Sequence, residues 1–386
     1  MRPSPRILLV ALILWLASAA LFAADPPPLF YGVISDTQRP PTDPLPELKW
    51  AIGQINAVHP DFVLWPGDLT NGGAEAEYQN VLKAAKELKS PMYCLPGNHE
   101  APPGEAVYRA RFKQFTGQPT WQDVRVGGWH LILLDSIRFD QGKLQHDGVI
   151  GAEELNWLKA DLATLKPDEP IIVAEHHPFN LPADGLTNTK QLLDAFADRD
   201  LLYTVTGHLH YNRHAEDPAG IHHFVTGALS FSCAPKECGL GYRLISTVGR
   251  DLWTAWIETK EPAPFNKWYE TAGPGALKTT YPIALPQPSG EGAQVAAQTA
   301  AQVAVRVRYS GDGLALTWGK RTVQRLPAAA QAATAVVILA PKLSAAILRG
   351  PSSALSLRPR GKTSVERIEV YRTGAKWEHY RLKAGK

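Results

Sequence analysis

Apolar residues follow two alternating patterns over the first two thirds of the chain. Short apolar, β-branched runs typical of buried strands occupy residues 30–35, 62–65, 92–95, 130–135, 171–174, 202–206, 223–226 and 242–248. Between them, apolar residues recur at helical spacing over 45–57, 75–88, 105–115, 152–165 and 190–196. Strands that alternate with helices predict an α/β domain, with functional loops at the C-terminal ends of its strands.

The pattern changes after residue 260. Residues 261–302 contain six prolines and an Ala/Gln-rich run, which predict a linker or a long strap along the surface. Beyond it, apolar and polar residues alternate over 303–309, and a Gly-Asp-Gly turn leads into 314–318, which predicts a β-hairpin. Further strands are expected at 335–339, 368–371 and 377–382. We therefore predict an α/β domain over 25–260, a linker over 261–302 and a small all-β module over 303–386.

The formal net charge of +3 hides two parts of opposite sign. Residues 301–386 carry 16 Lys and Arg against 4 Asp and Glu, a balance of +12, which leaves −9 for residues 1–300. A basic module invites an anionic partner, such as an envelope surface or extracellular nucleic acid. Alternatively, the module packs against its acidic neighbour, or its arginines are simply distributed over a solvent-exposed surface. These alternatives are favoured because no nucleic-acid motif of aromatic and basic residues is visible.

The first 24 residues have the pattern of a secretory signal peptide. Arg2 and Arg6 precede an apolar run over 7–16, and small residues follow up to Ala24. The run is short for a membrane span, and an uncleaved N-terminal anchor is the alternative. We expect an exported protein, periplasmic or extracellular after cleavage.

Three cysteines are too few for a disulfide scaffold or a cysteine-built metal site. Cys233 and Cys238 are close enough in sequence for a small-loop disulfide, whereas Cys94 lies in an apolar run and is expected to be a buried thiol. A bound metal would therefore need His, Asp, Glu, Asn or Gln ligands.

Five short polar motifs each follow a predicted strand. They are Ser35-Asp36-Thr37-Gln38, Gly67-Asp68, Gly97-Asn98-His99-Glu100, His176-His177 and Gly207-His208-Leu209-His210. Carboxylates, amide oxygens and imidazoles are ligands for divalent and transition metals. Each motif alone is weak, because such short patterns also arise as ordinary turns.

Together and in this order, the motifs resemble those of the calcineurin-like metallophosphoesterase family, whose signature runs Asp-x-His, Gly-Asp, Gly-Asn-His-Asp/Glu, His and Gly-His-x-His. The resemblance covers about residues 29–259. It implies a four-layer sandwich of two mixed sheets flanked by helices, with a binuclear metal centre at the strand ends. It also implies a phosphoesterase that hydrolyses a phosphomonoester or phosphodiester by attack of a metal-bridging hydroxide.

The same resemblance implies the ligand set. Asp36, Asp68 and His210 would hold the first metal, and Asp68 would be shared with a second metal held by Asn98, His176 and His208. His99 is similar to the family's general acid or transition-state stabiliser, with Glu100 or Asp135 to orient its ring. The two ions would be Mn, Fe, Zn or Mg.

Gln38 departs from the family pattern, which has His at this position. An amide oxygen is a harder ligand than imidazole and would favour Mn, Mg or Fe over Zn in the first site. Alternatively, Gln38 only forms hydrogen bonds near the site. The departure also leaves open a pseudoenzyme that binds a phosphorylated ligand or a protein partner without turnover. A separate alternative is a structural envelope protein whose metals only stabilise its loops.

Overall fold

The computed structural model describes residues 25–179, 181, 184–231, 239–259, 265–285, 302–349 and 355–383. The predicted signal peptide and the predicted Cys233–Cys238 disulfide lie outside the described residues. Within these ranges, no helix combines the length and the apolar character needed to cross a membrane. Cys94 is buried, as predicted.

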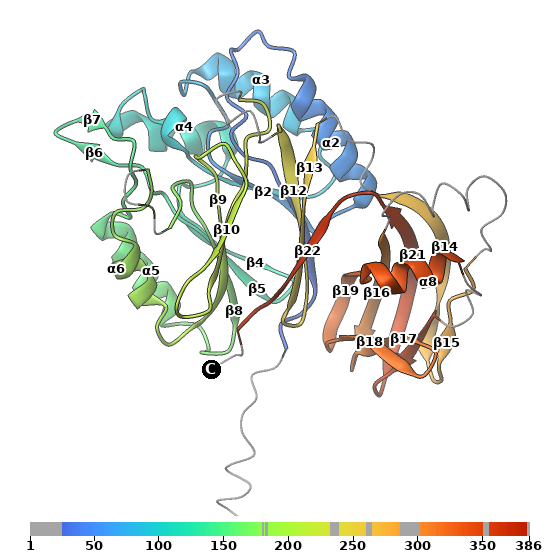
Figure 1. Ribbon diagram of the computed structural model, residues 1–386. Helices are drawn as coiled ribbons and strands as arrows, with labels where there is room; N and C mark the ends of the chain where they lie inside the picture. Colours follow the sequence, from blue (N-terminus) through green and yellow to red (C-terminus); the bar gives the residue numbers. More distant parts are fainter. Residues whose placement is uncertain are drawn as a thin grey trace, which may run out of the picture.

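Two six-stranded mixed sheets form the core of the larger domain (Figure 1). The first sheet has the order β22-β13-β12-β1-β2-β3, with β1 (Leu29–Val33), β2 (Phe62–Pro66), β3 (Met92–Leu95), β12 (Gly241–Val248), β13 (Asp251–Glu258) and β22 (Trp377–Arg381). The second has the order β10-β11-β9-β8-β5-β4, with β4 (Gln122–Val126), β5 (Trp129–Leu133), β8 (Pro170–Ala174), β9 (Asp200–Thr206), β10 (Arg213–Glu216) and β11 (His222–Val225). A short hairpin, β6 (Phe139–Asp140) and β7 (Lys143–Leu144), stands apart.

Alternation along the strands sorts the side chains into layers. Tyr31 and Val33 of β1 face the apolar core between the sheets, while Phe30 packs outward in one cluster with the apolar face of α2. On the second sheet, Ile172 faces the inner core and Val173 packs outward with α5 and α6. The helices are α2 (Pro46–Val58), α3 (Glu75–Ala85), α4 (Glu105–Thr116), α5 (Ala152–Leu162) and α6 (Thr189–Ala195). The four-layer sandwich is thus confirmed.

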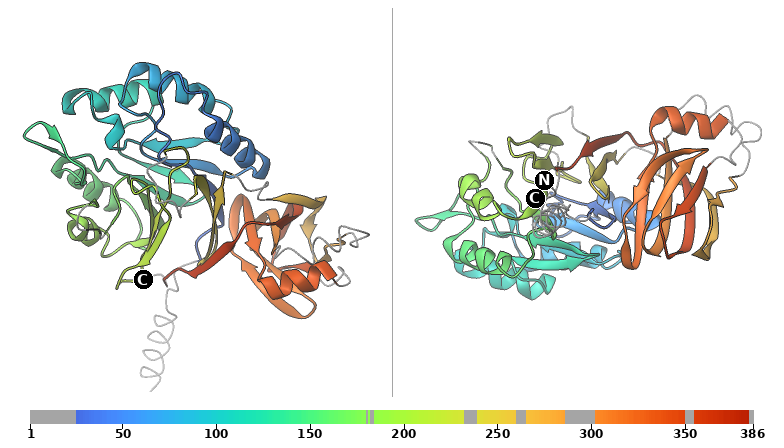
Figure 2. Two further views of the ribbon diagram at one scale, coloured as in Figure 1. Left: turned by 45° about the horizontal axis from the view of Figure 1, so that its top comes forward. Right: turned by 90° about the horizontal axis from the view of Figure 1, so that it is seen from below.

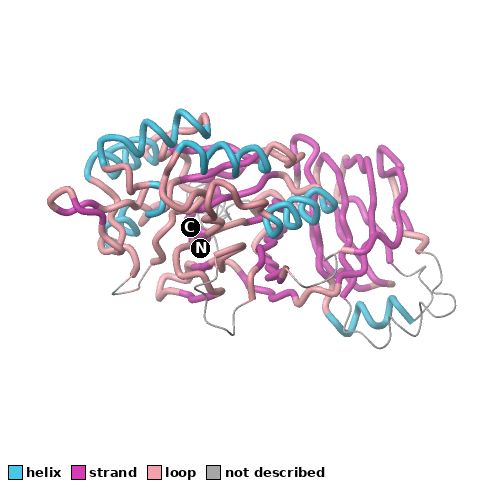
Figure 3. Tube along the Cα trace, turned by 90° about the horizontal axis from the view of Figure 1, so that it is seen from above, coloured by secondary structure: helices cyan, strands magenta, loops and turns pink. Residues whose placement is uncertain are grey.

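The described residues of the C-terminal unit form two four-stranded sheets and one helix, and the unit stands beside the larger domain (Figures 2 and 3). One sheet contains β14 (Asn266–Leu277), β21 (Thr363–Thr373), β16 (Gln302–Gly311) and β19 (Ala329–Ile338); the other contains β15 (Tyr281–Pro282), β20 (Leu355–Pro359), β17 (Leu314–Trp318) and β18 (Arg321–Leu326). The helix is α8 (Pro341–Arg349), so the module is β-rich but not purely β. Val303, Val305 and Val337 share one apolar cluster with Phe30, so this unit covers part of the outer face of the first sheet.

The strands cross the domain boundaries expected from composition at two places. β14 lies within the predicted linker, yet it pairs along most of its length with β21. β22 lies within the predicted C-terminal module, yet it pairs with β13 at the edge of the first large sheet, from Asp251↔Arg381 to Ala255↔Trp377. Alternation of apolar residues identifies a strand without identifying the sheet that receives it.

The predicted hairpin over residues 303–318 is wrong. Both segments form strands, but β16 pairs with β19 and β21, whereas β17 pairs with β18 and β20 of the other sheet. Gly311 (φ 104°) and Gly313 (φ 97°) carry the chain between the two sheets, and a Cβ on Gly311 would collide with the Lys362 carbonyl oxygen. A Gly-Asp-Gly sequence marks a sharp change of direction in either arrangement, so the local signal does not distinguish them.

Candidate metal centre

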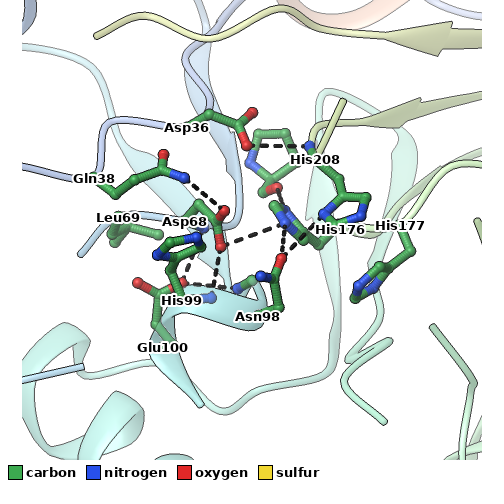
Figure 4. Close-up of polar contacts among 12 residues, drawn as sticks. Asp36, Gln38, Asp68, Leu69, Asn98, His99, Glu100, His176, His177 and His208 are labelled. Carbon is green, nitrogen blue, oxygen red and sulfur yellow. Dashed lines mark hydrogen bonds and ion pairs between the residues drawn. The ribbon is translucent and has the colours of Figure 1, made fainter. Parts of the chain in front are cut away.

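All five polar motifs lie just beyond the ends of neighbouring strands. Asp36, Asp68 and Asn98 follow β1, β2 and β3, which are parallel neighbours in the first sheet. His176 follows β8, and the loop with His208 and His210 follows β9, its parallel neighbour in the second sheet. Because parallel strands end at one edge of a sheet, the two sets of loops meet across the sandwich (Figure 4).

Four of the nominated ligands have left-handed backbone conformations: Asp36 (φ 54°), Asp68 (φ 54°), His208 (φ 71°) and His210 (φ 59°). This region is uncommon for residues other than glycine and is concentrated at functional sites. The loops are also tightly packed, because a Cβ on Gly97 would collide with the Asp68 carboxylate. The backbone is therefore shaped to aim these side chains at a common point.

A first group of ligand atoms comes from Asp36, Asp68 and His210, which lie within 4.8 Å of one another. His210 Nε2 is 3.2 Å from Asp36 Oδ1, and Gln38 Nε2 donates to Asp68 Oδ2 at 3.0 Å. Asp36 Oδ2 and Gln38 Oε1 are buried without a hydrogen-bond partner in the described part of the chain. Such oxygens are costly to bury unpaired, and a cation beside them would satisfy them.

A second group surrounds Asn98. Its Oδ1 is 3.0 Å from both His176 Nε2 and His208 Nδ1, and Asp68 Oδ1 is 3.4 Å from His176 Nε2. His176 Nδ1 lies 2.9 Å from the Pro66 carbonyl oxygen, which can only accept. Nδ1 therefore carries a hydrogen, and Nε2 is the atom directed toward Asn98 and Asp68. Asp68 thus touches both groups, which suits a shared ligand.

The two histidines of this group, His176 and His208, differ in the pKa of their imidazoles. Burial, followed by the charge of His176, lowers the pKa of His208 to about 3, so its imidazole is neutral, the form that binds metals. Burial also disfavours the charged form of His176, but the neighbouring Asp68 outweighs it and raises the pKa of His176 to about 9. A cation at His176 would have to displace that proton, so its binding there would weaken as the pH falls.

His99 stands outside both groups of ligand atoms. Its backbone N–H donates to Asp68 Oδ1 at 2.9 Å, while its ring Nδ1 lies 2.7 Å from the Asn71 carbonyl oxygen. Neither Glu100 nor Asp135 forms a described hydrogen bond with the ring, so the expectation that one of them orients it is replaced by this carbonyl contact. The pairing of Nδ1 leaves Nε2 available to a ligand.

Glu100 has a role that its motif did not reveal. Its fully buried carboxylate accepts from the backbone N–H of Asp68 (2.9 Å) and of Gly97 (2.8 Å), and from the N–H (2.7 Å) and hydroxyl (2.8 Å) of Thr70. It therefore ties the loop that carries Asp68 to the loop that carries Asn98. Asp135 instead binds Arg109 and Tyr108.

Two residues at this site were missed by sequence reasoning. The Phe231 ring packs between His99 and His210, at centroid distances of 6.0 and 4.9 Å. The exposed His146, in the loop before α5, has its ring 6.5 Å from that of His208. Neither lies in a motif, so no local signal marked them. His177, by contrast, is buried with Nδ1 2.8 Å from Ser136 Oγ, as suits a packing role.

The Gln38 ligand prediction can be tested by substitution. Gln38→Met keeps the side-chain length and removes the oxygen, and we expect it to weaken binding of the first metal about ten- to a hundredfold. Gln38→Glu keeps an oxygen and adds a charge, so it should bind that metal more tightly. Calorimetric titration of the metal-stripped variants with Mn²⁺ measures both effects. Equal affinities for the parent and Gln38→Met would show that Gln38 is no ligand.

The first part of the chain is similar to known phosphoesterases. Residues 31–212 match the family model for calcineurin-like phosphoesterases. A probable cyclic nucleotide phosphodiesterase of Rhodopseudomonas palustris is 30% identical over 186 residues, which cover 44% of this chain and 64% of the relative. A cAMP/cGMP dual specificity phosphodiesterase of Mycobacterium tuberculosis is 29% identical over 201 residues, covering 48% of this chain and 58% of the relative. The chain thus spans less than two thirds of these relatives.

Among solved structures, a dimetal phosphatase from Danio rerio aligns with 60% of this chain and 97% of its own, with a TM-score of 0.50 and 14% identity. At that identity, the likeness concerns the fold alone.

Proposed function

We propose that the protein is a metal-dependent phosphodiesterase, in support of which residues 31–212 match the family model for calcineurin-like phosphoesterases. One observation carries the proposal: seven nominated ligands from loops of two sheets converge, with Asp68 in contact with both groups of ligand atoms. Cyclic nucleotides are the first substrate class to test, because similar proteins are named cyclic nucleotide phosphodiesterases.

The side chains present fit two metal ions. Asp36, Gln38, Asp68 and His210 would hold one ion, and Asp68, Asn98, His176 and His208 would hold the other. Two such ions supply positive charge for the phosphoryl oxygens and lower the pKa of a bound water. The amide oxygen of Gln38 favours Mn, Mg or Fe in the first site.

His99 is the chain's own candidate for proton transfer. The Asn71 carbonyl fixes its ring through Nδ1, so Nε2 can donate a proton to the leaving-group oxygen as the phosphorus–oxygen bond breaks. Phe231 supports the other side of the site by packing against both His99 and His210.

Hydrolysis assays with added Mn²⁺ test the proposal. We expect turnover of bis(p-nitrophenyl) phosphate and of 3′,5′-cyclic AMP, and slower turnover of the monoester p-nitrophenyl phosphate. Asp68→Asn, prepared in the same way, measures the background from contaminating phosphatases. Equal rates for the two proteins on every substrate would reject an enzyme and leave the pseudoenzyme alternative.

We also propose that the protein acts outside the cytoplasm, in support of which Arg2, Arg6 and the apolar run over 7–16 have the order of a signal peptide. N-terminal sequencing of protein from an envelope or secreted fraction would show cleavage near Ala24, and an intact Met1 would favour an anchor. Attraction of the basic C-terminal unit to an anionic envelope surface stays a prediction. Part of its charge is neutralised internally, because Arg306 pairs with Glu369 and Arg308 pairs with Glu366.

A further inference from the structure

We propose that a second site, separate from the metal centre, binds a small phosphate-like oxyanion. The site is a cavity of about 420 Å³ at the open edges of the two large sheets, lined by residues of β10, β12, β13 and β22 and by their flanking turns. The residues that carry the argument are Arg213, Arg243, Trp256, Glu258, Lys376 and Glu378. None of the seven nominated metal ligands lines it.

Arg243 is a buried cation whose hydrogen-bond acceptors in the described part of the chain are all neutral. Its residue is 4% exposed, and none of its atoms lies within 4 Å of a carboxylate in the described ranges. Nη1 donates to Thr254 Oγ1 (3.0 Å), and Nη2 donates to Asn212 Oδ1 (2.8 Å) and to the Val225 carbonyl oxygen (3.0 Å), all neutral acceptors. A buried charge is normally paired, so an anion in the cavity would supply the missing partner.

Two hydrogen-bond donors of residues that line the cavity have no acceptor among the described residues. Arg243 Nε and Trp256 Nε1 are both buried without a partner among the described residues. The two residues are register partners on the antiparallel strands β12 and β13, so their side chains share one face of the sheet. A guanidinium beside an indole N–H offers several donors to one oxyanion, and the guanidinium fork matches phosphate oxygens.

The charge of the cavity also favours an anion. Arg213, Arg243 and Lys376 face Glu258 and Glu378, a balance of +1, and none of the five forms an ion pair with a described residue. Burial lowers the pKa of Arg243 to about 10, which leaves its guanidinium charged at neutral pH. The two carboxylates disfavour a large polyanion, so the chemistry suits a single small oxyanion.

The cavity is connected to the metal centre by one short loop. Asn212, which accepts from Arg243, also accepts from the backbone N–H of Gly227 at 3.3 Å and lies two residues after His210. An anion on Arg243 would therefore lie beside Asn212, which follows the Gly-His-x-His loop. Its source would be free phosphate or the phosphate group of a phosphomonoester.

Indole resonances provide a readout that does not depend on hydrolysis. The full chain, labelled with ¹⁵N-tryptophan and loaded with diamagnetic Mg²⁺, is titrated with inorganic phosphate and, separately, with AMP. Trp256→Phe identifies the Trp256 signal. We expect that signal to shift in a saturable manner. Tighter binding of AMP would identify a phosphomonoester as the source, and similar affinities would identify free phosphate.

Variants that remove charge test whether the shift of the Trp256 signal arises from binding in the cavity beside Arg243. Arg213→Ala/Lys376→Ala should weaken the apparent affinity about tenfold or more, because it removes two cations at the rim. Lys320→Ala/Arg358→Ala removes the same charge from the C-terminal unit and should leave the affinity unchanged. Asp68→Asn should keep the Trp256 shift even if the phosphodiesterase proposal fails. A Trp256 signal that does not move, or moves alike in the parent and the rim variant, would overturn the site.

Discussion

Asp68→Asn should lower kcat/KM for a diester substrate by about 10³-fold or more, because it removes the negative charge of the carboxylate that both groups of ligand atoms share. Asp68 lies 3.4 Å from His176 Nε2 through one oxygen and 3.0 Å from Gln38 Nε2 through the other. Asparagine keeps the shape and an oxygen that can accept from the His99 backbone N–H, so the fold should persist. Steady-state kinetics with saturating Mn²⁺ and elemental analysis of the purified protein measure the two effects.

Asp61→Asn is the matched control for this variant. Asp61 lies at the opposite end of the same strand, where its carboxylate accepts from the Phe30 backbone N–H at 2.8 Å. Asp61→Asn removes one partly buried carboxylate beside the same sheet without touching the candidate site, so activity and metal content should stay near those of the parent. If Asp68→Asn kept two metal equivalents and most of the activity, Asp68 would not be the shared ligand.

His99→Asn should reduce activity in proportion to how much the leaving group needs a proton. In cyclic AMP the leaving group is a ribose oxygen, which is a strongly basic alkoxide unless it is protonated. Loss of a general acid should therefore lower kcat for cyclic AMP by about 10²- to 10⁴-fold. p-Nitrophenolate leaves without protonation, so bis(p-nitrophenyl) phosphate should be hydrolysed at a rate close to that of the parent. Metal content should be unchanged, because the His99 ring lies outside both ligand groups.

The comparison of the two substrates separates the roles that His99 can have. Equal losses on both would identify a transition-state stabiliser instead of a general acid, and no loss on either would remove His99 from the mechanism. His59→Asn, at the C-terminal end of α2, is the matched control for a histidine substitution, and its rates should equal those of the parent.

Local pattern predicts the helices and most strands of the larger domain, but it missed β4, β10 and β13. The strand at Met92–Leu95 has the expected bounds, and the helices that begin at Glu75, Glu105 and Ala152 start where expected. The other failures concern which strands pair with one another. The pattern favours one hairpin for β16 and β17, and it groups β22 with the module that precedes it, whereas both arrangements are wrong. Pairing depends on residues far along the chain, which periodicity within a short window does not contain.

The candidate site divides in the same way. Residue chemistry and motif order are enough to nominate Asp36, Asp68, His208 and the other ligands, because ligand type and position after a strand are local properties of the sequence. Three-dimensional packing alone decides that the Asn71 carbonyl orients His99, that Glu100 ties two loops together and that Arg243 donates to neutral acceptors among the described residues. These contacts join segments separated by tens to hundreds of residues, as His208 and Asn98 are by 110. They exist only once the sheets have packed, since burial and distance are properties of the assembled fold.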